Sequence, residues 1–482
     1  MTTLFSAQGL YFAHRLDPVL QLDHWRWERG QSWAVVGGNG AGKTTLARLL
    51  AGELETQRGS LLRPADGAVA LVGFEQQRQL MAHDNRFDDS DVREDAFDVG
   101  SRVRDVILQG RPADARYSSL VQRFRMAHIL ERGIRFISTG EARKTLLVRA
   151  LLAAPEALIL DNPYEGLDQA SQQEMRGLLE ELLQGELPVM VLVKQAEEIP
   201  AGITHVLALE HGLAIYQGPR AGYRPGAAAA QRIWPALPAA SPVPVAAGQP
   251  LIELAGVNLS YGDTPVLRDI HWRLYPGDHC CIRGPNGAGK SSLLSLLTGD
   301  NHKVYGQPLS LLGRRRGSGE SVWEVKALFG VVSTALQLQH IARVRVAEVV
   351  ASGFFDSVGL YQDCSDQQRH QALAWLDIIG LQDQATQRFE TLSFGEQRLA
   401  LVARAMVKAP RFLVLDEPCL GLDTQHRADV LSLADHIAAS GHTQLLYVSH
   451  SAGEAPRAIN QWLDLVPHPD GGSTLRVSRR PD

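Results

Sequence analysis

Short apolar runs that stop at a glycine are the first pattern along the chain. Residues 32–36 and 279–282 are such runs, and a glycine-rich loop follows each of them. Residues 44–50 and 291–297 come next and have the composition of helices. The apolar runs predict buried strands, because they are short and bounded by glycine. Strand, glycine loop and helix in this order indicate an α/β domain with a mainly parallel sheet.

The same series of motifs occurs twice. The octapeptide Gly37-Gly-Asn-Gly-Ala-Gly-Lys-Thr44 returns 247 residues later as Gly284-Pro-Asn-Gly-Ala-Gly-Lys-Ser291. Farther along, Leu158-Ile-Leu-Asp161 returns 255 residues later as Leu413-Val-Leu-Asp416. Landmarks repeated in the same order indicate two copies of one domain rather than a short-repeat solenoid.

The repeat defines the expected domain organisation. We predict a first domain over residues 1–224 and a second domain over residues 251–482. Residues 225–250 between them are rich in Ala and Pro and nearly free of charge, which predicts a semi-rigid linker.

Composition narrows the class of protein. The 482 residues are 45% hydrophobic and 21% charged, as is ordinary for a soluble globular protein. The formal net charge of −5 argues against nucleic acid as the main partner, because phosphate neutralisation needs an excess of Lys and Arg. None of the four cysteines has metal-ligand spacing, so we expect free thiols in a reducing, cytoplasmic compartment. We expect no signal peptide, because the first 20 residues lack a basic segment followed by an apolar one. No run approaches about 18 apolar residues, so we expect a membrane role to need another chain.

Both octapeptides match the pattern Gly-x-x-x-x-Gly-Lys-[Ser/Thr], and each lies between a predicted strand and a predicted helix. Glycines let backbone N–H groups turn toward phosphate oxygens, and the helix N-terminus adds partial positive charge. We expect the lysines to reach the β- and γ-phosphates of ATP, and the hydroxyls of Thr44 and Ser291 to bind Mg²⁺. The predicted ATP-binding residues of these two phosphate loops are Gly37, Asn39, Gly40, Gly42, Lys43, Thr44 and Thr45, and Gly284, Asn286, Gly287, Gly289, Lys290, Ser291 and Ser292.

The two repeats differ where the next apolar strand ends. The second repeat has Asp416 and Glu417, whereas the first has Asp161 and Asn162. We expect Asp416 to hold the magnesium shell and Glu417 to polarise the attacking water, a role worth about 10²–10⁴ in rate. Asn162 has no negative charge and does not accept a proton usefully at neutral pH. The sequence therefore predicts one competent hydrolytic site and one weakened site.

Two further segments carry a resemblance to a known family. Leu392-Ser-Phe-Gly-Glu-Gln397 resembles the signature motif of ABC (ATP-binding cassette) ATPases, and Ile137-Ser-Thr-Gly-Glu141 is similar to a divergent version. Each contains Ser-x-x-Glu, a capping box that begins a helix, 23 residues before its strand aspartate. The resemblance covers nearly all of the chain. It implies two P-loop NTPase cassettes, each α/β with a mainly parallel sheet, an antiparallel accessory sheet and a helical subdomain.

The resemblance also implies that two cassettes pair head to tail, so that each ATP lies between the phosphate loop of one and the signature motif of the other. Site one would combine the first phosphate loop with Asp161, Gln76, Ser393 and Gly395. Site two would combine the second phosphate loop with Asp416, Glu417, Ser138 and Gly140. The implied magnesium ligands are Thr44, Asp161, Gln76, Ser291 and Asp416.

Other family positions differ between the repeats. His450 lies where the family places its switch histidine, which contacts the γ-phosphate and positions the water, and the matching residue in the first repeat is Lys194. Tyr261 suits the aromatic residue that stacks on adenine, whereas its counterpart His14 is a weaker platform. Site one therefore lacks both the acid and the histidine that site two has.

The family's glutamine loop binds magnesium and senses the membrane partner. Gln76 or its neighbour Gln77 fits this loop in the first repeat, whereas Val332-Ser333-Thr334 occupies the expected place in the second repeat. The usual coupling route through the second repeat is therefore not expected.

Within the family, the tandem order, the short linker and Leu312-Gly-Arg-Arg-Arg-Gly-Ser-Gly-Glu320 followed by Trp323 resemble bacterial ATPases associated with molybdate transport. This resemblance implies an ATPase that energises a separate transmembrane permease at the inner face of the bacterial inner membrane. The arginine run at residues 314–316 is compatible with an oxyanion or nucleotide contact, but a solvated loop on the accessory sheet is the favoured interpretation.

A soluble ABC ATPase that acts on ribosomes, or one with a purely regulatory role, is the alternative. Ribosome-associated members usually carry a long, charged, helical interdomain linker and a basic tail. Here the linker is uncharged and short, and the tail at residues 476–480 is only weakly basic. The sequence therefore favours the transport association.

Overall fold

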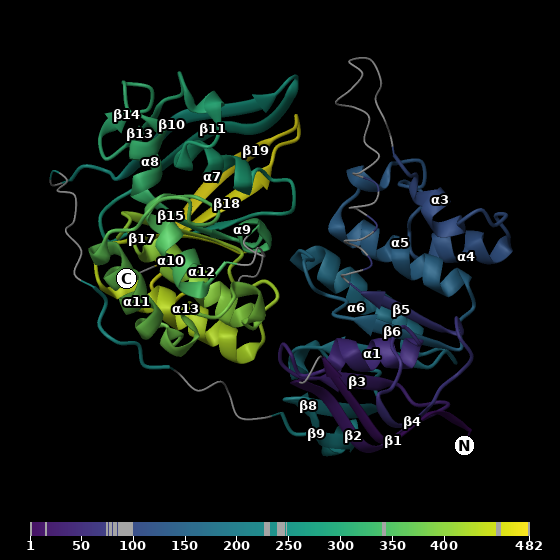
Figure 1. The fold of residues 1–482 in the computed structure, drawn as a ribbon. Coiled ribbons are helices and arrows are strands. Elements are labelled where there is room, and N and C mark those ends of the chain that lie inside the picture. Colours follow the sequence, from purple (N-terminus) through teal and green to yellow (C-terminus); the bar gives the residue numbers. More distant parts are fainter. Residues whose placement is uncertain are drawn as a thin grey trace. The chain divides into compact units, whose positions relative to one another are not determined.

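The computed structural model describes residues 2–14, 17–73, 76, 80, 84, 100–225, 232–238, 246, 248–339, 344–449 and 455–480. The chain divides into two compact units, Met1–Ala228 and Ala229–Asp482 (Figure 1). Each unit has its own sheet and its own hydrophobic cores. None of the described helices is long and apolar enough to span a bilayer.

The first unit is built around one mixed sheet. Among the described residues, the strand order is β4-β1-β2-β9-β8-β3-β7-β6-β5. The strands are β1 (Thr3–His14), β2 (Asp17–Glu28), β3 (Trp33–Val36), β4 (Arg58–Leu62), β5 (Val69–Gly73), β6 (Ala157–Asp161), β7 (Val189–Val193), β8 (His205–Glu210) and β9 (Leu213–Pro219). The described α-helices are α1 (Lys43–Ala51), α3 (Val103–Leu108), α4 (Ala115–Arg123), α5 (Thr139–Leu152) and α6 (Gln169–Leu183).

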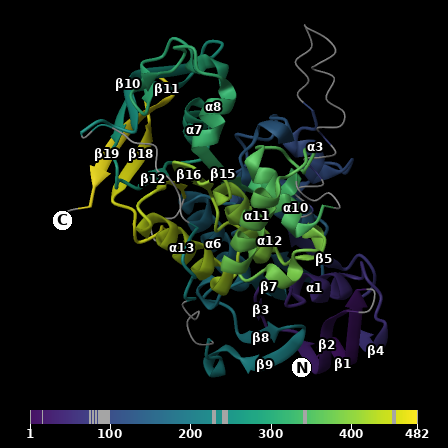
Figure 2. The same ribbon diagram turned by 60° about the vertical axis from the view of Figure 1, so that its left-hand side comes forward.

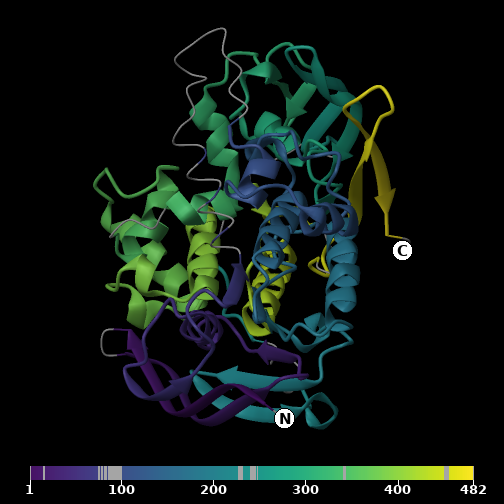
Figure 3. The same cartoon turned by 90° about the vertical axis from the view of Figure 1, so that its right-hand side faces the viewer.

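Parallel and antiparallel pairing divide this sheet into two regions. Strands β8, β3, β7, β6 and β5 are joined by parallel pairs, whereas β1 pairs antiparallel with both β2 and β4. Figure 3 shows the purple antiparallel strands at one end of the unit and the blue helices at the other. The predicted mainly parallel sheet with an antiparallel accessory part is thus confirmed.

Strand β3 is buried on both faces, which explains why its sequence is apolar throughout. Trp33 and Val35 join the core that contains α1, whereas Ala34 and Val36 join the core that contains α5 and α6. Successive side chains of a strand point to opposite faces, so one short apolar run serves two cores. This double burial fixes the strand from which the first phosphate loop begins.

The second unit repeats this plan. Among the described residues, its strand order is β14-β13-β10-β11-β19-β18-β12-β17-β16-β15. The strands are β10 (Ile252–Tyr261), β11 (Thr264–Leu274), β12 (Cys280–Arg283), β13 (Leu309–Leu311), β14 (Arg314–Arg315), β15 (Phe329–Ser333), β16 (Phe412–Asp416), β17 (Gln444–Val448), β18 (Gln461–Pro467) and β19 (Ser473–Arg479). The described α-helices are α7 (Lys290–Thr298), α8 (Val322–Leu328), α9 (Thr334–Gln339), α10 (Val346–Ala351), α11 (Asp366–Ile378), α12 (Phe394–Met406) and α13 (Thr424–Ala439).

The helices of the second unit fall into two groups. In Figures 1 and 2, α7 and α8 lie beside β10 and β11, whereas α10, α11 and α12 gather at the other end of the unit. The second group shares one core with the face of the sheet that includes Leu413 and Leu415. All four cysteines of the chain are in this unit, where they are buried free thiols.

Part of the predicted linker packs against the second unit. Trp234 is 8% exposed and belongs to the core that contains α11, α12 and α13. Its indole Nε1 donates a hydrogen bond to Ser432 Oγ at 2.9 Å, and Pro235 O lies 2.8 Å from His436 Nε2. The Arg232 guanidinium covers the indole ring at 4.6 Å. An apolar anchor inside the Ala/Pro-rich stretch thus makes residues 232–238 part of the second unit.

We predict that Trp234→Ala destabilises the second unit by about 3 kcal/mol, because it removes a buried indole and its hydrogen bond. Urea unfolding followed by circular dichroism measures the change. The matched control is Ile233→Ala, since Ile233 is 93% exposed and its truncation should leave stability nearly unchanged. Equal unfolding midpoints for the two variants would show that the packed segment contributes nothing.

Candidate functional site

The first phosphate loop connects β3 to α1 and closes around its own lysine. Lys43 is buried, and its Nζ donates hydrogen bonds to Gly37 O at 2.6 Å and Gly38 O at 2.8 Å. Gly42 has a φ of 90°, and a Cβ at this position would lie 2.6 Å from Val19 O. Only glycine fits there, because the positive φ and the close backbone both exclude a side chain.

The second phosphate loop has the same geometry between β12 and α7. Lys290 Nζ donates to Gly284 O at 2.8 Å and to Pro285 O at 3.0 Å. Gly289 has a φ of 92°, and a Cβ there would lie 2.9 Å from a methyl carbon of Leu267. Both octapeptides therefore lie in the predicted strand–loop–helix context, where the first amides of a helix face the loop.

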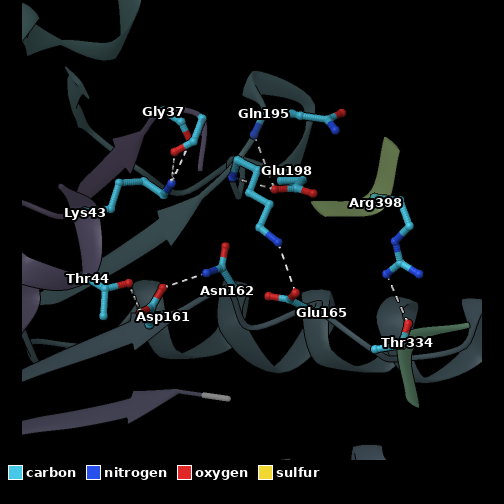
Figure 4. Close-up of polar contacts among 12 residues, drawn as sticks. Gly37, Lys43, Thr44, Asp161, Asn162, Glu165, Gln195, Glu198, Thr334 and Arg398 are labelled. Carbon is cyan, nitrogen blue, oxygen red and sulfur yellow. Dashed lines mark hydrogen bonds and ion pairs between the residues drawn. The ribbon is translucent and has the colours of Figure 1, made fainter. Parts of the chain in front are cut away.

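Oxygen donors gather beside the first phosphate loop. Thr44 Oγ1 donates a hydrogen bond to Asp161 Oδ2 at 2.6 Å (Figure 4). A Cβ at Gly73 would lie 3.1 Å from Asp161 Cβ and 3.2 Å from Gln76 Oε1, so the glutamine oxygen is near the same aspartate. Burial raises the pKa of the Asp161 carboxyl. A hydroxyl, a carboxylate and an amide oxygen are hard ligands that suit Mg²⁺. In the second unit, Ser291 and Asp416 occupy the same places on α7 and β16.

The residue after each strand aspartate has the same backbone conformation in both units. Asn162 has a φ of 49° and Glu417 a φ of 48°. The Asn162 N–H donates to Leu192 O at 3.0 Å, and the Glu417 N–H donates to Val448 O at 3.1 Å. The two side chains therefore leave the sheet from matching positions, and only their chemistry differs.

The Asn162 side chain is held by its neighbour. Its Nδ2 donates to Asp161 Oδ1 at 2.7 Å, as Figure 4 shows. An amide in this arrangement donates a hydrogen bond and offers no carboxylate to a water molecule. Glu417 keeps a carboxylate at the equivalent place.

Sequence reasoning missed a carboxylate at the first site. Glu165 lies three residues after Asn162, and its Oε1 accepts a hydrogen bond from Lys194 Nζ at 3.0 Å (Figure 4). Leu420 is the matching residue in the second repeat. The sequence did contain a sign of this role, because Glu165 is charged where the matching residue of the other repeat is apolar.

Two buried arginines were also missed. Arg143 on α5 donates to Asn162 O at 2.9 Å and to Glu165 O at 3.4 Å. Arg398 on α12 is the matching residue, is 0% exposed, and donates to Thr334 Oγ1 at 3.2 Å. Burial lowers the pKa of Arg398 to about 10, while the negative charges near it, including those of Asp416 and Glu417, act in the opposite direction. Each arginine links its helix to segments that border the same unit's phosphate loop.

The two signature segments begin helices as predicted. Ser138 with Glu141 and Ser393 with Glu396 form capping boxes at the starts of α5 and α12, which confirms this prediction. A Cβ at Gly140 would lie 3.1 Å from Ser171 Oγ, and one at Gly395 would lie 2.1 Å from His426 Cγ. The glycines thus allow the next helix to pack closely.

A surface pocket in the first unit includes the signature residues Ser138 and Gly140. Its charged lining is mixed, because Lys144 pairs with Glu174 at 3.1 Å and His128 lies 3.5 Å from Glu141.

The remaining predicted residues lie apart from these clusters or outside the described residues. Tyr261 is exposed, its hydroxyl accepts a hydrogen bond from Asn301 Nδ2 at 2.9 Å, and Lys303 Nζ lies 5.0 Å from its ring centre. Gln337 on α9 was missed, and its Nε2 donates to Phe394 O at 3.2 Å and to Gln397 Oε1 at 3.0 Å, toward the signature helix. His450, Gln77 and the His14 side chain lie outside the described residues.

The arginine run has mixed roles. Arg316 is buried and pairs with Glu320 at 2.6 Å, and the N–H of Gly317 donates to the same carboxylate at 2.7 Å. Arg316 thus closes its own turn. Arg314 and Arg315 are exposed on β14.

Comparisons with known proteins agree with these features. A model of the ABC transporter family matches residues 20–165 and 267–420. The chain is 40% identical over 487 residues to the ABC transporter ATP-binding protein ModF of Escherichia coli (strain K12), with 98% of each chain covered. It is 27% identical over 453 residues to an uncharacterized ABC transporter ATP-binding protein of Schizosaccharomyces pombe, with 90% of this chain and 92% of that protein covered.

The fold also matches a solved structure. This is the complex of the archaeal ribosomal stalk protein aP1 and the archaeal ribosome recycling factor aABCE1, with a TM-score of 0.59, 15% identity, and 97% of this chain and 89% of that chain covered. At this identity the match concerns the fold alone. The family match over both repeats, the two closed phosphate loops and the full-length relative show that this chain belongs to the ABC transporter ATP-binding family and is an ABC ATPase with two cassettes in tandem.

Proposed function

We propose that this ATPase hydrolyses ATP much faster at site two than at site one. The observation that carries the proposal is the pair Glu417 and Asn162, which leave the sheet from matching backbone positions with different side chains. Glu417 offers a carboxylate that polarises a water molecule, whereas the Asn162 amide is engaged with Asp161.

Each phosphate loop binds the β- and γ-phosphates through its amides and its lysine. A magnesium ion at each site would neutralise phosphate charge. Thr44, Asp161 and Gln76 would hold it in the first unit, and Ser291 and Asp416 in the second. His450 would position the water beside Glu417, and Tyr261 would carry the adenine.

The signature motifs complete the sites in this proposal. Ser138 and Gly140 would contact the nucleotide of site two, and Ser393 and Gly395 that of site one, as the family resemblance implies. Support comes from the capped helix starts and from the surface pocket that includes Ser138 and Gly140.

We further propose that ATP hydrolysis by this chain energises transport through a separate permease. Support comes from the relative named as an ABC transporter ATP-binding protein, which matches over 98% of both chains. Molybdate is the proposed cargo class, on the resemblance to molybdate-associated members of the family.

A ribosome-associated role is the second candidate. It is favoured by the fold match over 97% of this chain to a ribosome recycling factor. The connecting segment, which is nearly free of charge, and the low identity make it the weaker candidate.

We predict that Glu417→Gln lowers ATP turnover by about 10²-fold or more while nucleotide binding persists, because the amide cannot polarise the water. The matched control is Asn162→Gln, which keeps an amide and should leave turnover near the wild-type value. Phosphate release gives turnover, and a fluorescent ATP analogue gives binding. Equal losses in both variants would contradict the asymmetric assignment.

The transport proposal predicts that the tagged chain copurifies with an integral membrane protein from detergent-solubilised membranes. Sucrose-gradient fractionation of the same cells, with ATP present, tests the alternative. Cosedimentation with ribosomal subunits and no membrane partner would replace the transport proposal with the ribosomal one.

A further inference from the structure

A partly buried ion pair borders the first phosphate loop and takes no part in the function proposed above. Lys194 Nζ and Glu165 Oε1 are 3.0 Å apart, and their side chains are only 11% and 20% exposed. Such a pair is stable when both charges are present, whereas removing one partner leaves a buried charge uncompensated. The second unit has Leu420 in place of Glu165, so the pair is specific to the first unit.

The ion pair lies next to the place where a terminal phosphate would bind. The Gly37 N–H donates to Val193 O at 3.3 Å, so Lys194 directly follows a residue bonded to the phosphate loop. Asp161 accepts hydrogen bonds from Thr44 Oγ1 at 2.6 Å and from Asn162 Nδ2 at 2.7 Å, and Arg143 donates to the backbone oxygens of Asn162 and Glu165. These contacts connect the ion pair to the proposed magnesium ligand.

The backbones of both partners are fixed. The N–H groups of Lys194 and Gln195 donate to Glu198 Oε2 at 2.9 and 3.4 Å. On the other side, the buried Arg143 donates to Glu165 O at 3.4 Å. From this anchored backbone the Lys194 side chain reaches Glu165, where its Nζ donates to Oε1 at 3.0 Å. The flexible four-carbon lysine chain is thus the part that is able to move.

We propose that Lys194 makes site one selective for nucleoside triphosphates by exchanging Glu165 for the terminal phosphate. Without a γ-phosphate, the ammonium stays with the carboxylate. A terminal phosphate offers three acceptor oxygens and more negative charge than one carboxylate, so it competes successfully for the same ammonium. A diphosphate has no group at this position and leaves the pair intact. The inference rests on the proposed function, because it takes residues 37–44 to hold a nucleotide.

The consequence is a site that keeps ATP bound without hydrolysing it quickly. Asn162 supplies no base, whereas Lys194 supplies an extra cation for the triphosphate. Glu165 competes with the terminal phosphate for the Lys194 ammonium, so its attraction for that ammonium lowers the affinity for the triphosphate.

The test uses the full chain carrying Lys290→Met, so that nucleotide binding reports on site one. Magnesium-dependent affinities for a non-hydrolysable ATP analogue and for ADP are measured by isothermal titration. Adding Lys194→Met should lower the affinity for the ATP analogue by about 10- to 100-fold, the range of a lost charge-assisted hydrogen bond. The affinity for ADP should stay unchanged. Adding Glu165→Gln should raise the affinity for the ATP analogue several-fold, because the carboxylate that competes for Lys194 is removed. The expected signature is a change in the ratio of the two affinities.

The control for general destabilisation is Lys408→Met. Lys408 Nζ lies 2.6 Å from Asp356 Oδ2 in a comparably buried ion pair of the second unit. This variant should not alter the affinity ratio at site one. If Lys194→Met lowers the affinities for both nucleotides equally, or lowers neither, Lys194 does not select the triphosphate and the inference is overturned. If the Lys290→Met parent binds neither nucleotide, the first phosphate loop is not a nucleotide site and the proposed function itself fails.

Discussion

The buried lysine of each phosphate loop is the constraint on which the rest of the site depends. In both units its ammonium is held by the carbonyls of the first two residues of the loop. This contact folds the loop back on itself and leaves the helix N-terminus facing the enclosed space. The strand before the loop is buried on both faces, and its parallel neighbours end at the same edge of the sheet. The parallel strand ends alone therefore bring the side chains that follow those strands to the loop.

Duplication has preserved this backbone while the charges around it have diverged. The first unit has two carboxylates and two ammonium groups near one strand end, with an amide where the second unit has a glutamate. Both units keep a buried guanidinium near two carboxylates, that of Arg143 in the first and that of Arg398 in the second. Because both backbones follow the same path, the difference in chemistry arises from a few side chains. The two units thus combine similar folds with different side chains at the strand end.

Local sequence patterns predicted the parts of the site that depend on neighbours along the chain. The phosphate loops, the strands before them and the capping boxes of α5 and α12 all follow from short motifs, and the structure has them where they were predicted. Glu165, Arg143, Arg398 and Gln337 were not predicted, because their roles arise from contacts between segments far apart in sequence. Trp234 was missed for the same reason, since an Ala/Pro-rich stretch gives no sign that it packs on a core. The assignments of Glu417 and His450 remain predictions.

The left-handed backbone at Glu417 has a consequence for how such a protein evolves. Asparagine tolerates this conformation better than glutamate, because its short side chain bonds locally, as Asn162 does. A glutamate there costs about 1–3 kcal/mol of strain. A change from glutamate to asparagine at this position is thus expected to raise the melting temperature, and selection for turnover opposes that change. In a protein whose catalysis needs only one of its two cassettes, as proposed here, the other cassette is free to carry the residue that fits this backbone with less strain.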